Sequence, residues 1–110
     1  MSLTPTPPPQ HKAGDSFTRL MVVPDAFADG YFTGWEVKSE IRNEAGHLVA
    51  ACVCEWLDAL TTRNLKLRVV NTTSWRPGLV FIDVQFTRTA DGEVMSTTTA
   101  SFTVVKDITQ

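Results

Sequence analysis

Apolar and polar residues alternate with a period of two along most of the chain, and this pattern predicts β-strands. Residues 35–42 show the alternation most clearly, because charged side chains take every second position. The opposite side of this segment consists of Trp35, Val37, Ser39 and Ile41. A strand with this pattern buries one face and leaves the other in water. Further strands are expected in the segments 16–23, 47–56, 64–70, 79–86 and 94–105.

Turn-forming residues separate these segments. Residues 43–46 predict a hairpin between the second and third strands, Pro24 ends the first strand, and Asp91-Gly92 is a strong hairpin signal. Residues 57–63 fit either a short turn or a crossing loop. No segment has the pattern of a helix of standard length. The chain is therefore expected to be all-β, an antiparallel β-sandwich of about seven strands.

The segment 79–86 carries more apolar residues than one buried face needs. Its first face is expected to be core and consists of Val80, Ile82, Val84 and Phe86. The second face begins with Leu79 and Phe81 and then becomes polar. Leu79 and Phe81 are therefore expected to be covered, either by a loop or the N-terminal arm of the same chain, or by another subunit.

A chain of 110 residues is long enough for one domain with its own core. Residues 1–14 hold most of the prolines and little to bury, so they are expected to form a flexible arm. Residues 15–110 are expected to form the domain. The arm is either a plain tail or a strap that docks on a neighbouring subunit.

Charge and composition argue against two classes of partner. The net charge is −2, the pI is about 5.6, and the ten Lys and Arg residues are scattered, so neither a nucleic acid nor a membrane is an expected partner. No apolar run has the length of a membrane span. The N-terminus lacks the pattern of a secretion signal, so we expect synthesis in a cytoplasm, where Cys52 and Cys54 would remain free thiols.

Candidate catalytic and metal-binding groups are few. His11 lies in the arm and His47 follows a turn, and no nucleophile motif accompanies them, so no catalytic residue and no enzyme activity are expected. Cys52, Cys54 and His47 are the best metal ligands, but a structural zinc site usually needs four, so we expect no metal and no cofactor. The two cysteines would be inert if they face the core and sensitive to oxidation if they face outward.

Two stretches carry a family resemblance. FTGWEVKSEIRNEAGHLVA, which starts at Phe32, resembles the LTGW…V…IR…G.LV opening of a group of small phage and prophage structural proteins. From Trp75 to Thr109, a W-x-P-G turn, a strand ending in D-x-Q-x-T, a D-G hairpin and a terminal D-I-T resemble their closing half. These proteins resemble immunoglobulin-like domains of tail and baseplate components, including the N-terminal domain of baseplate upper proteins. Residues 51–63 depart from the pattern.

The resemblance implies an immunoglobulin-like, non-catalytic virion structural protein of the tail or baseplate. Its partners would be other virion subunits or further copies of itself, and it would be made in the bacterial host cytoplasm and located in the virion. We expect the contact surface to be formed by Leu79, Phe81, Tyr31 and Phe32. The alternative is a module that binds carbohydrate or a host surface through an aromatic platform, for which the candidates are Tyr31, Phe32, Trp35, Trp56 and Trp75.

Overall fold

The computed structural model describes residues 10–97 and 99–106, and the regular structure in them is entirely β. The strands are β1 (Gln10–Lys12), β2 (Phe17–Val22), β3 (Trp35–Asn43), β4 (Leu48–Trp56), β5 (Asn64–Val69), β6 (Gly78–Arg88), β7 (Val94–Ser96) and β8 (Ala100–Val105). The predicted all-β class is confirmed, and the described residues contain no helix. The segment predicted as one strand at 94–105 is divided into β7 and β8.

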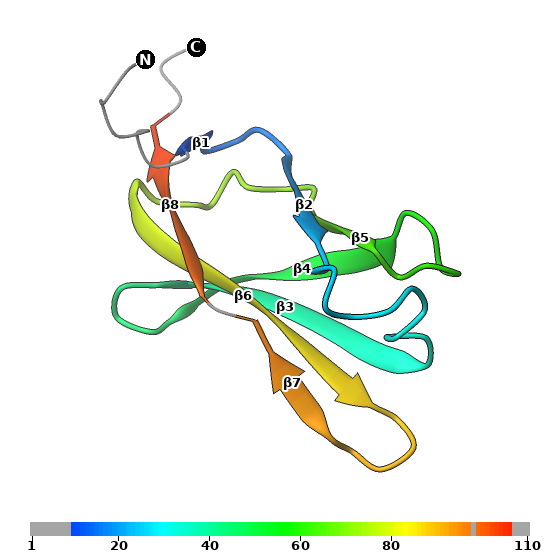
Figure 1. Cartoon of the computed structure of the whole chain (residues 1–110). Coiled ribbons are helices and arrows are strands. Elements are labelled where there is room, and N and C mark those ends of the chain that lie inside the picture. The colour runs from blue at the N-terminus through cyan, green and yellow to red at the C-terminus, as the bar shows by residue number, and fades with distance from the viewer. Residues whose placement is uncertain (1–9, 98, 107–110) are drawn as a thin grey trace, which may run out of the picture.

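The eight strands form one sheet that curls until it is nearly a closed barrel (Figure 1). Its order is β1-β8-β6-β3-β4-β5-β2, and β7 also pairs with β6. β8 pairs with the first part of β6 and β7 with its last part, so the two short strands follow one another along the same edge. The barrel remains open along a seam between β2, at one end of the sheet, and β7 and β8 near the other.

One end of this seam is closed by hydrogen bonds around Thr72, which is fully buried. The Gly14 amide, in the link from β1 to β2, donates to the Thr72 hydroxyl at 2.8 Å. The Thr72 hydroxyl donates in turn to the Asp15 carbonyl at 2.6 Å. The link between β1 and β2 is thus held against the segment that follows β5.

β4 connects the two halves of the barrel because it pairs with different strands along its length. Its first half pairs with β3, and its second half pairs with β5, where Val53 lies opposite Arg68. A β-bulge between Ile41 and Arg42 interrupts the register of β3 with β4. Bulges bend a strand and increase its twist, which helps a sheet to turn a corner.

Two predictions are more specific than the all-β class: the immunoglobulin-like sandwich and the flexible N-terminal arm. The immunoglobulin-like sandwich is not confirmed, because one continuous path of paired strands runs around the barrel. Within the predicted arm, Gln10–Lys12 form β1 and pair in parallel with β8, so that Gln10 lies opposite Thr103. Residues 1–9, the rest of the predicted arm, lie outside the described residues.

The core fills the barrel and is built against the inward side of β6. This side consists of Val80, Ile82, Val84 and Phe86, each of them 3% exposed, as the alternation predicts. Buried side chains from four other strands pack around it: Phe17, Ile41, Leu65, Leu67, Phe102 and Val104. Full burial of one such side chain contributes about 1.5–3 kcal/mol relative to exposure, so these contacts hold the sheet in its curled form.

Arg63 ties the loop after β2 to the start of β5. Its guanidinium donates, at 2.8–2.9 Å, to three backbone carbonyls, those of Val23, Pro24 and Phe27. It also forms an ion pair with Asp29 at 2.7 Å. A side chain that satisfies several carbonyls of one loop fixes the conformation of that loop.

The neighbouring loop residue, Thr62, holds Phe32 in place. Thr62 is buried and has a φ of 47°, which is uncommon for a β-branched residue. Its hydroxyl accepts the Phe32 amide at 3.3 Å, and the Gly30 amide donates to the Thr61 carbonyl at 2.7 Å. Residues 57–63 are thus a loop that docks on the loop between β2 and β3.

We predict that Arg63→Ala lowers the free energy of unfolding by about 2–3 kcal/mol, because it leaves several loop carbonyls without their charged donor. Urea unfolding monitored by tryptophan fluorescence measures this change. Arg68→Ala, on the exposed face of β5, is the matched control and should stay within about 0.5 kcal/mol of the parent. Equal stability of the two variants would contradict the role of Arg63.

Candidate binding surfaces

Leu79 and Phe81, two of the predicted contact residues, lie half-buried on the outer face of β6. Phe81 stands opposite Arg42 of β3, and Arg42 stands opposite Leu48 of β4. Leu48 is 53% exposed and lines the same groove as Leu79, beside the turn that precedes β6. Arg42 thus lies between Phe81 and Leu48, and we call Leu48, Leu79 and Phe81 the outer-face patch.

Alternation along the sequence does not predict Leu48 on the outer face, because a β-bulge shifts its register. Regular alternation along β4 places Leu48 on the same side as Ala50 and Cys52, which pack against the core. The bulge removes Val49 from the register, so Leu48 rather than Val49 lies opposite Arg42, on the outer face. No local pattern in the sequence marks this bulge.

β1 does not cover the outer-face patch. It extends the sheet beyond β8 and therefore lies beside the patch, in the plane of the sheet. Residues 1–9 lie outside the described residues. It therefore remains a prediction that residues 1–9 or another subunit cover the outer-face patch.

Tyr31 and Phe32, the other predicted contact residues, lie far from the patch. They pack near Trp35, which pairs with Arg88 at the far end of β6, roughly 20 Å along the strand from Phe81. Phe32 is 2% exposed and stacks on Phe86 at 4.2 Å between ring centroids. It is a core residue, so the prediction that places it in a contact surface does not fit this structure, whereas Tyr31 is 43% exposed.

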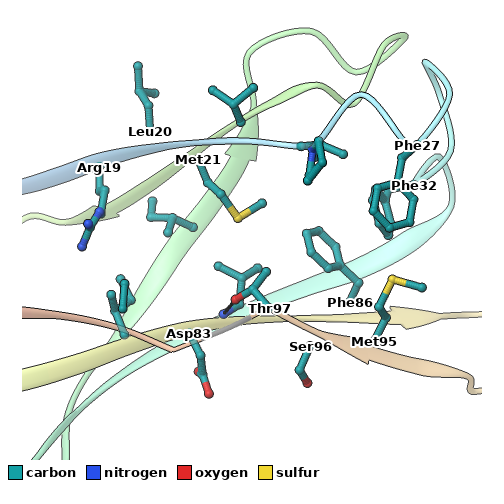
Figure 2. Close-up of a pocket in the computed structure, with 17 residues that line it drawn as sticks. Arg19, Leu20, Met21, Phe27, Phe32, Asp83, Phe86, Met95, Ser96 and Thr97 are labelled. Carbon is teal, nitrogen blue, oxygen red and sulfur yellow. Dashed lines mark hydrogen bonds between the residues drawn. The ribbon is translucent and has the colours of Figure 1, made fainter.

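A cleft that no pattern in the sequence predicts occupies the open seam of the barrel (Figure 2). One wall is β2 with the residues that follow it, and the other includes β7 and Ala100. Its inner side is formed by core residues, among them Leu67, Ile82, Val84 and Phe86. Its volume of about 570 Å³ is in the range of ligand sites in proteins. Arg19 lies at one end and Phe27 at the other.

Cys52 and Cys54 both face the inside of the barrel. Cys52 lies opposite the buried Ser39, and Cys54 lies opposite the buried Leu67. Burial raises the pKa of the Cys52 thiol, and burial together with the neighbouring Cys52 raises the pKa of Cys54 to about 11. The structure therefore favours the first of the two expectations, in which the thiols are unreactive.

The two histidines are far from forming a metal site with these cysteines. His11 packs between Phe17 and Trp75, with ring centroids 5.4 and 5.3 Å away, and its Nε2 lies 2.8 Å from the Asp15 carbonyl. His47 is exposed at the β3–β4 hairpin. In residues 10–97 and 99–106, no group of three or more His, Cys, Asp or Glu residues is placed to hold a metal ion.

The five aromatic residues considered for an aromatic platform do not form one. Phe32 and Trp75 are buried, and Trp35 and Trp56 are half-buried against the core. Tyr31 is the exposed member of this set.

No protein-family model matches the chain, and no curated protein matches it. The resemblance to phage structural proteins therefore rests on the sequence motifs alone. None of the described segments is a helix with the length and apolar character needed to cross a membrane.

We predict that Phe32→Ala lowers the free energy of unfolding by about 3–5 kcal/mol, because it removes a ring from the packed end of the core. Tyr31→Ala is the matched control at the adjacent position, and we expect it to cost less than half as much, since much of this ring is exposed. Urea unfolding of both variants measures the difference. A Phe32→Ala variant as stable as Tyr31→Ala would show that Phe32 is not a core residue.

We predict that the thiols of the folded protein react slowly with iodoacetamide at neutral pH, and that the rate for Cys54 keeps rising up to a pH of about 11. Unfolded in urea, both thiols should titrate near their ordinary pKa of 9.0. Because folding raises this pKa, its contribution to stability is complete below pH 9 and is lost as the pH rises towards 11. Rapid alkylation of the folded protein at pH 7 would contradict this assignment.

Proposed function

We propose that this protein is a non-catalytic structural subunit of a phage or prophage particle, in the tail or baseplate, that acts through protein–protein contacts. The observation that carries the proposal is the outer-face patch, in which Leu48, Leu79 and Phe81 place apolar surface on the outside of the sheet. The order of the motifs between residues 32 and 109 supports the assignment to phage structural proteins.

Arg42 gives the patch a second property of protein interfaces. It pairs with Glu40 at 3.2 Å and donates to the Gly46 carbonyl at 3.1 Å, so its guanidinium is held at the surface beside Phe81 and Leu48. Interfaces are enriched in aromatic residues and Arg, and an Arg that is already positioned loses less side-chain entropy on binding. A second subunit would bury the apolar side chains around this ordered charge.

We also propose that the fold of this protein is immunoglobulin-like. The division of β4 between two pairing partners supports it: β3, β6, β7, β8 and β1 lie on one side of that division, and β5 and β2 on the other. Two such sets of strands, packed through a shared core, are the elements of a sandwich. The alternative of carbohydrate binding has weaker support, because one exposed ring, Tyr31, is not a flat aromatic platform.

We predict that the parent protein forms a discrete oligomer and that the double variant Leu79→Ser and Phe81→Ser is a monomer. The substitutions remove most of the apolar area of the patch, at about 25 cal/mol per Å² before the costs of association. Light scattering coupled to size exclusion, at two concentrations about tenfold apart, measures the assembly state.

Leu60→Ser is the matched control, because Leu60 is 85% exposed and lies in the loop at the other end of the barrel. It should leave assembly unchanged. Thermal unfolding of all three proteins shows whether each is folded. A parent that is monomeric at both concentrations, or a folded double variant that still assembles, would contradict self-association through the patch.

A further inference from the structure

Among residues 10–97 and 99–106, the outer edge of β2 has no pairing partner, and this edge lies along the seam cleft. β2 ends the sheet of described strands, in which it pairs with β5. Leu20 and Val22 of β2 are 58% and 64% exposed. Proteins usually protect such an edge with a proline, a bulge or a covering segment, because its free N–H and C=O groups can pair with another strand.

The hydrogen bonds next to β2 show which of its backbone groups face the seam. The Val23 amide donates to the Arg63 carbonyl at 2.8 Å, so Val23 bonds towards the β5 side. Bonded and non-bonded pairs alternate along an antiparallel ladder, so the N–H and C=O groups of Thr18, Leu20 and Val22 point away from β5.

On the opposite side of the seam, β7 also has backbone groups that point away from its pairing strand. The Arg88 amide donates to the Glu93 carbonyl at 2.8 Å, and the Thr97 amide donates to the Val84 carbonyl at 2.8 Å. By the same alternation, the backbone groups of Val94 and Ser96 in β7 point away from β6. The cleft is therefore bordered on both sides by strand edges whose hydrogen-bonding groups have no pairing partner in the described part of the chain, over a floor of apolar side chains.

An occupant of the seam must be a strand with two free edges. A strand within a second folded copy already uses at least one edge in its own sheet, so it could pair with β2 but could not also pair with β7. Residues 1–9 of this chain include four prolines, which lack the N–H groups that pairing requires. An extended peptide segment of a partner protein meets both conditions.

Arg19 adds a requirement on the charge of the strand that occupies the seam. Its position in β2 places it on the inward side, where it lines one end of the cleft, and no ion pair links it to another described residue. An inward charge on an edge strand disfavours pairing with purely apolar strands. A strand that carries a carboxylate at this end removes the penalty by pairing with Arg19.

We propose that the seam cleft binds an extended peptide segment of a partner protein by β-strand addition. The segment has apolar side chains at alternate positions, directed at the core, and an acidic side chain at the Arg19 end. Main-chain hydrogen bonds to β2 provide affinity, and the alternate side chains provide specificity. This inference goes beyond the proposed function, because it concerns a surface that shares no residue with the outer-face patch.

The test uses fluorescence anisotropy with the full chain and two labelled, capped heptapeptides, Thr-Glu-Thr-Val-Thr-Val-Thr and the reverse order, which cover both strand directions. We expect saturable binding by one of them, with a Kd below about 1 mM. N-methylation of alternate residues in that peptide should weaken binding about tenfold or more, because it removes main-chain donors and keeps every side chain. A Lys in place of the Glu should also bind more weakly.

Two variants, with Leu20→Ala as a control, locate the site on the protein. Leu20→Pro removes an N–H that faces the seam and none that bonds to β5, so it should weaken binding about tenfold, whereas Leu20→Ala should stay within about threefold. Arg19→Glu should reverse the preference between the Glu and Lys peptides. Because N-methylation alters only the peptide, it decides the question even if Leu20→Pro unfolds.

Three results would overturn the proposal: no binding by either peptide up to about 1 mM, equal binding of the N-methylated peptide, or binding that a folded Leu20→Pro variant leaves unchanged. The variant with Leu79→Ser and Phe81→Ser should bind the peptide as the parent does. Failure of strand addition is therefore distinguishable from failure of assembly through the outer-face patch.

Discussion

Packing against the inward side of β6 is the interaction on which the rest of the structure depends. β6 is the longest strand, and it pairs with β3 on one edge and with β7 and β8 in succession on the other. Its inward side chains are covered only if the sheet curls so that β2 and β5 lie across from it. The curl therefore follows from the need to bury this apolar face, since burial supplies most of the favourable free energy of folding.

The need to bury the inward side of β6 also explains why the barrel remains open. One wall of the seam is made of two short strands, so its edge is not one straight ladder along which β2 could pair. Burial of the core requires β2 to cover the inside of β6, but it does not require hydrogen bonds from β2 to β7. Apolar packing is non-directional, whereas strand pairing needs aligned donors and acceptors. At the seam, the apolar side chains are packed, but the strand edges are not aligned for pairing.

Local patterns in the sequence predict what depends on near neighbours in the chain. The alternation in residues 79–86 identifies the core face correctly, and Asp91-Gly92 lies in the observed turn between β6 and β7, where Gly92 has a φ of 75°. Alternation also separates the wet face of β3 from its buried side. These features follow from side-chain period and turn chemistry, which a window of a few residues contains.

The features that the sequence does not predict depend on pairing between distant segments. Leu48 lies on the outer face because of a bulge in the β3–β4 register, and the seam exists because two edges of the described strands do not pair with each other. Phe32 resembles a surface aromatic residue in a Gly-rich segment, but a hydrogen bond to Thr62, thirty residues away, holds it over the core. Such contacts have no periodic signature, so only the folded chain shows them.

The outer-face patch and the seam cleft differ in the kind of selectivity they can have. A patch of apolar side chains favours any partner of matching shape, and its contribution grows with the area buried. The seam adds direction, because backbone groups at Leu20 and Val22 accept only a strand in register, and charge, because Arg19 disfavours a strand without a carboxylate. A charged side chain that protects an exposed edge from unspecific pairing can thus also define the partner that the edge accepts.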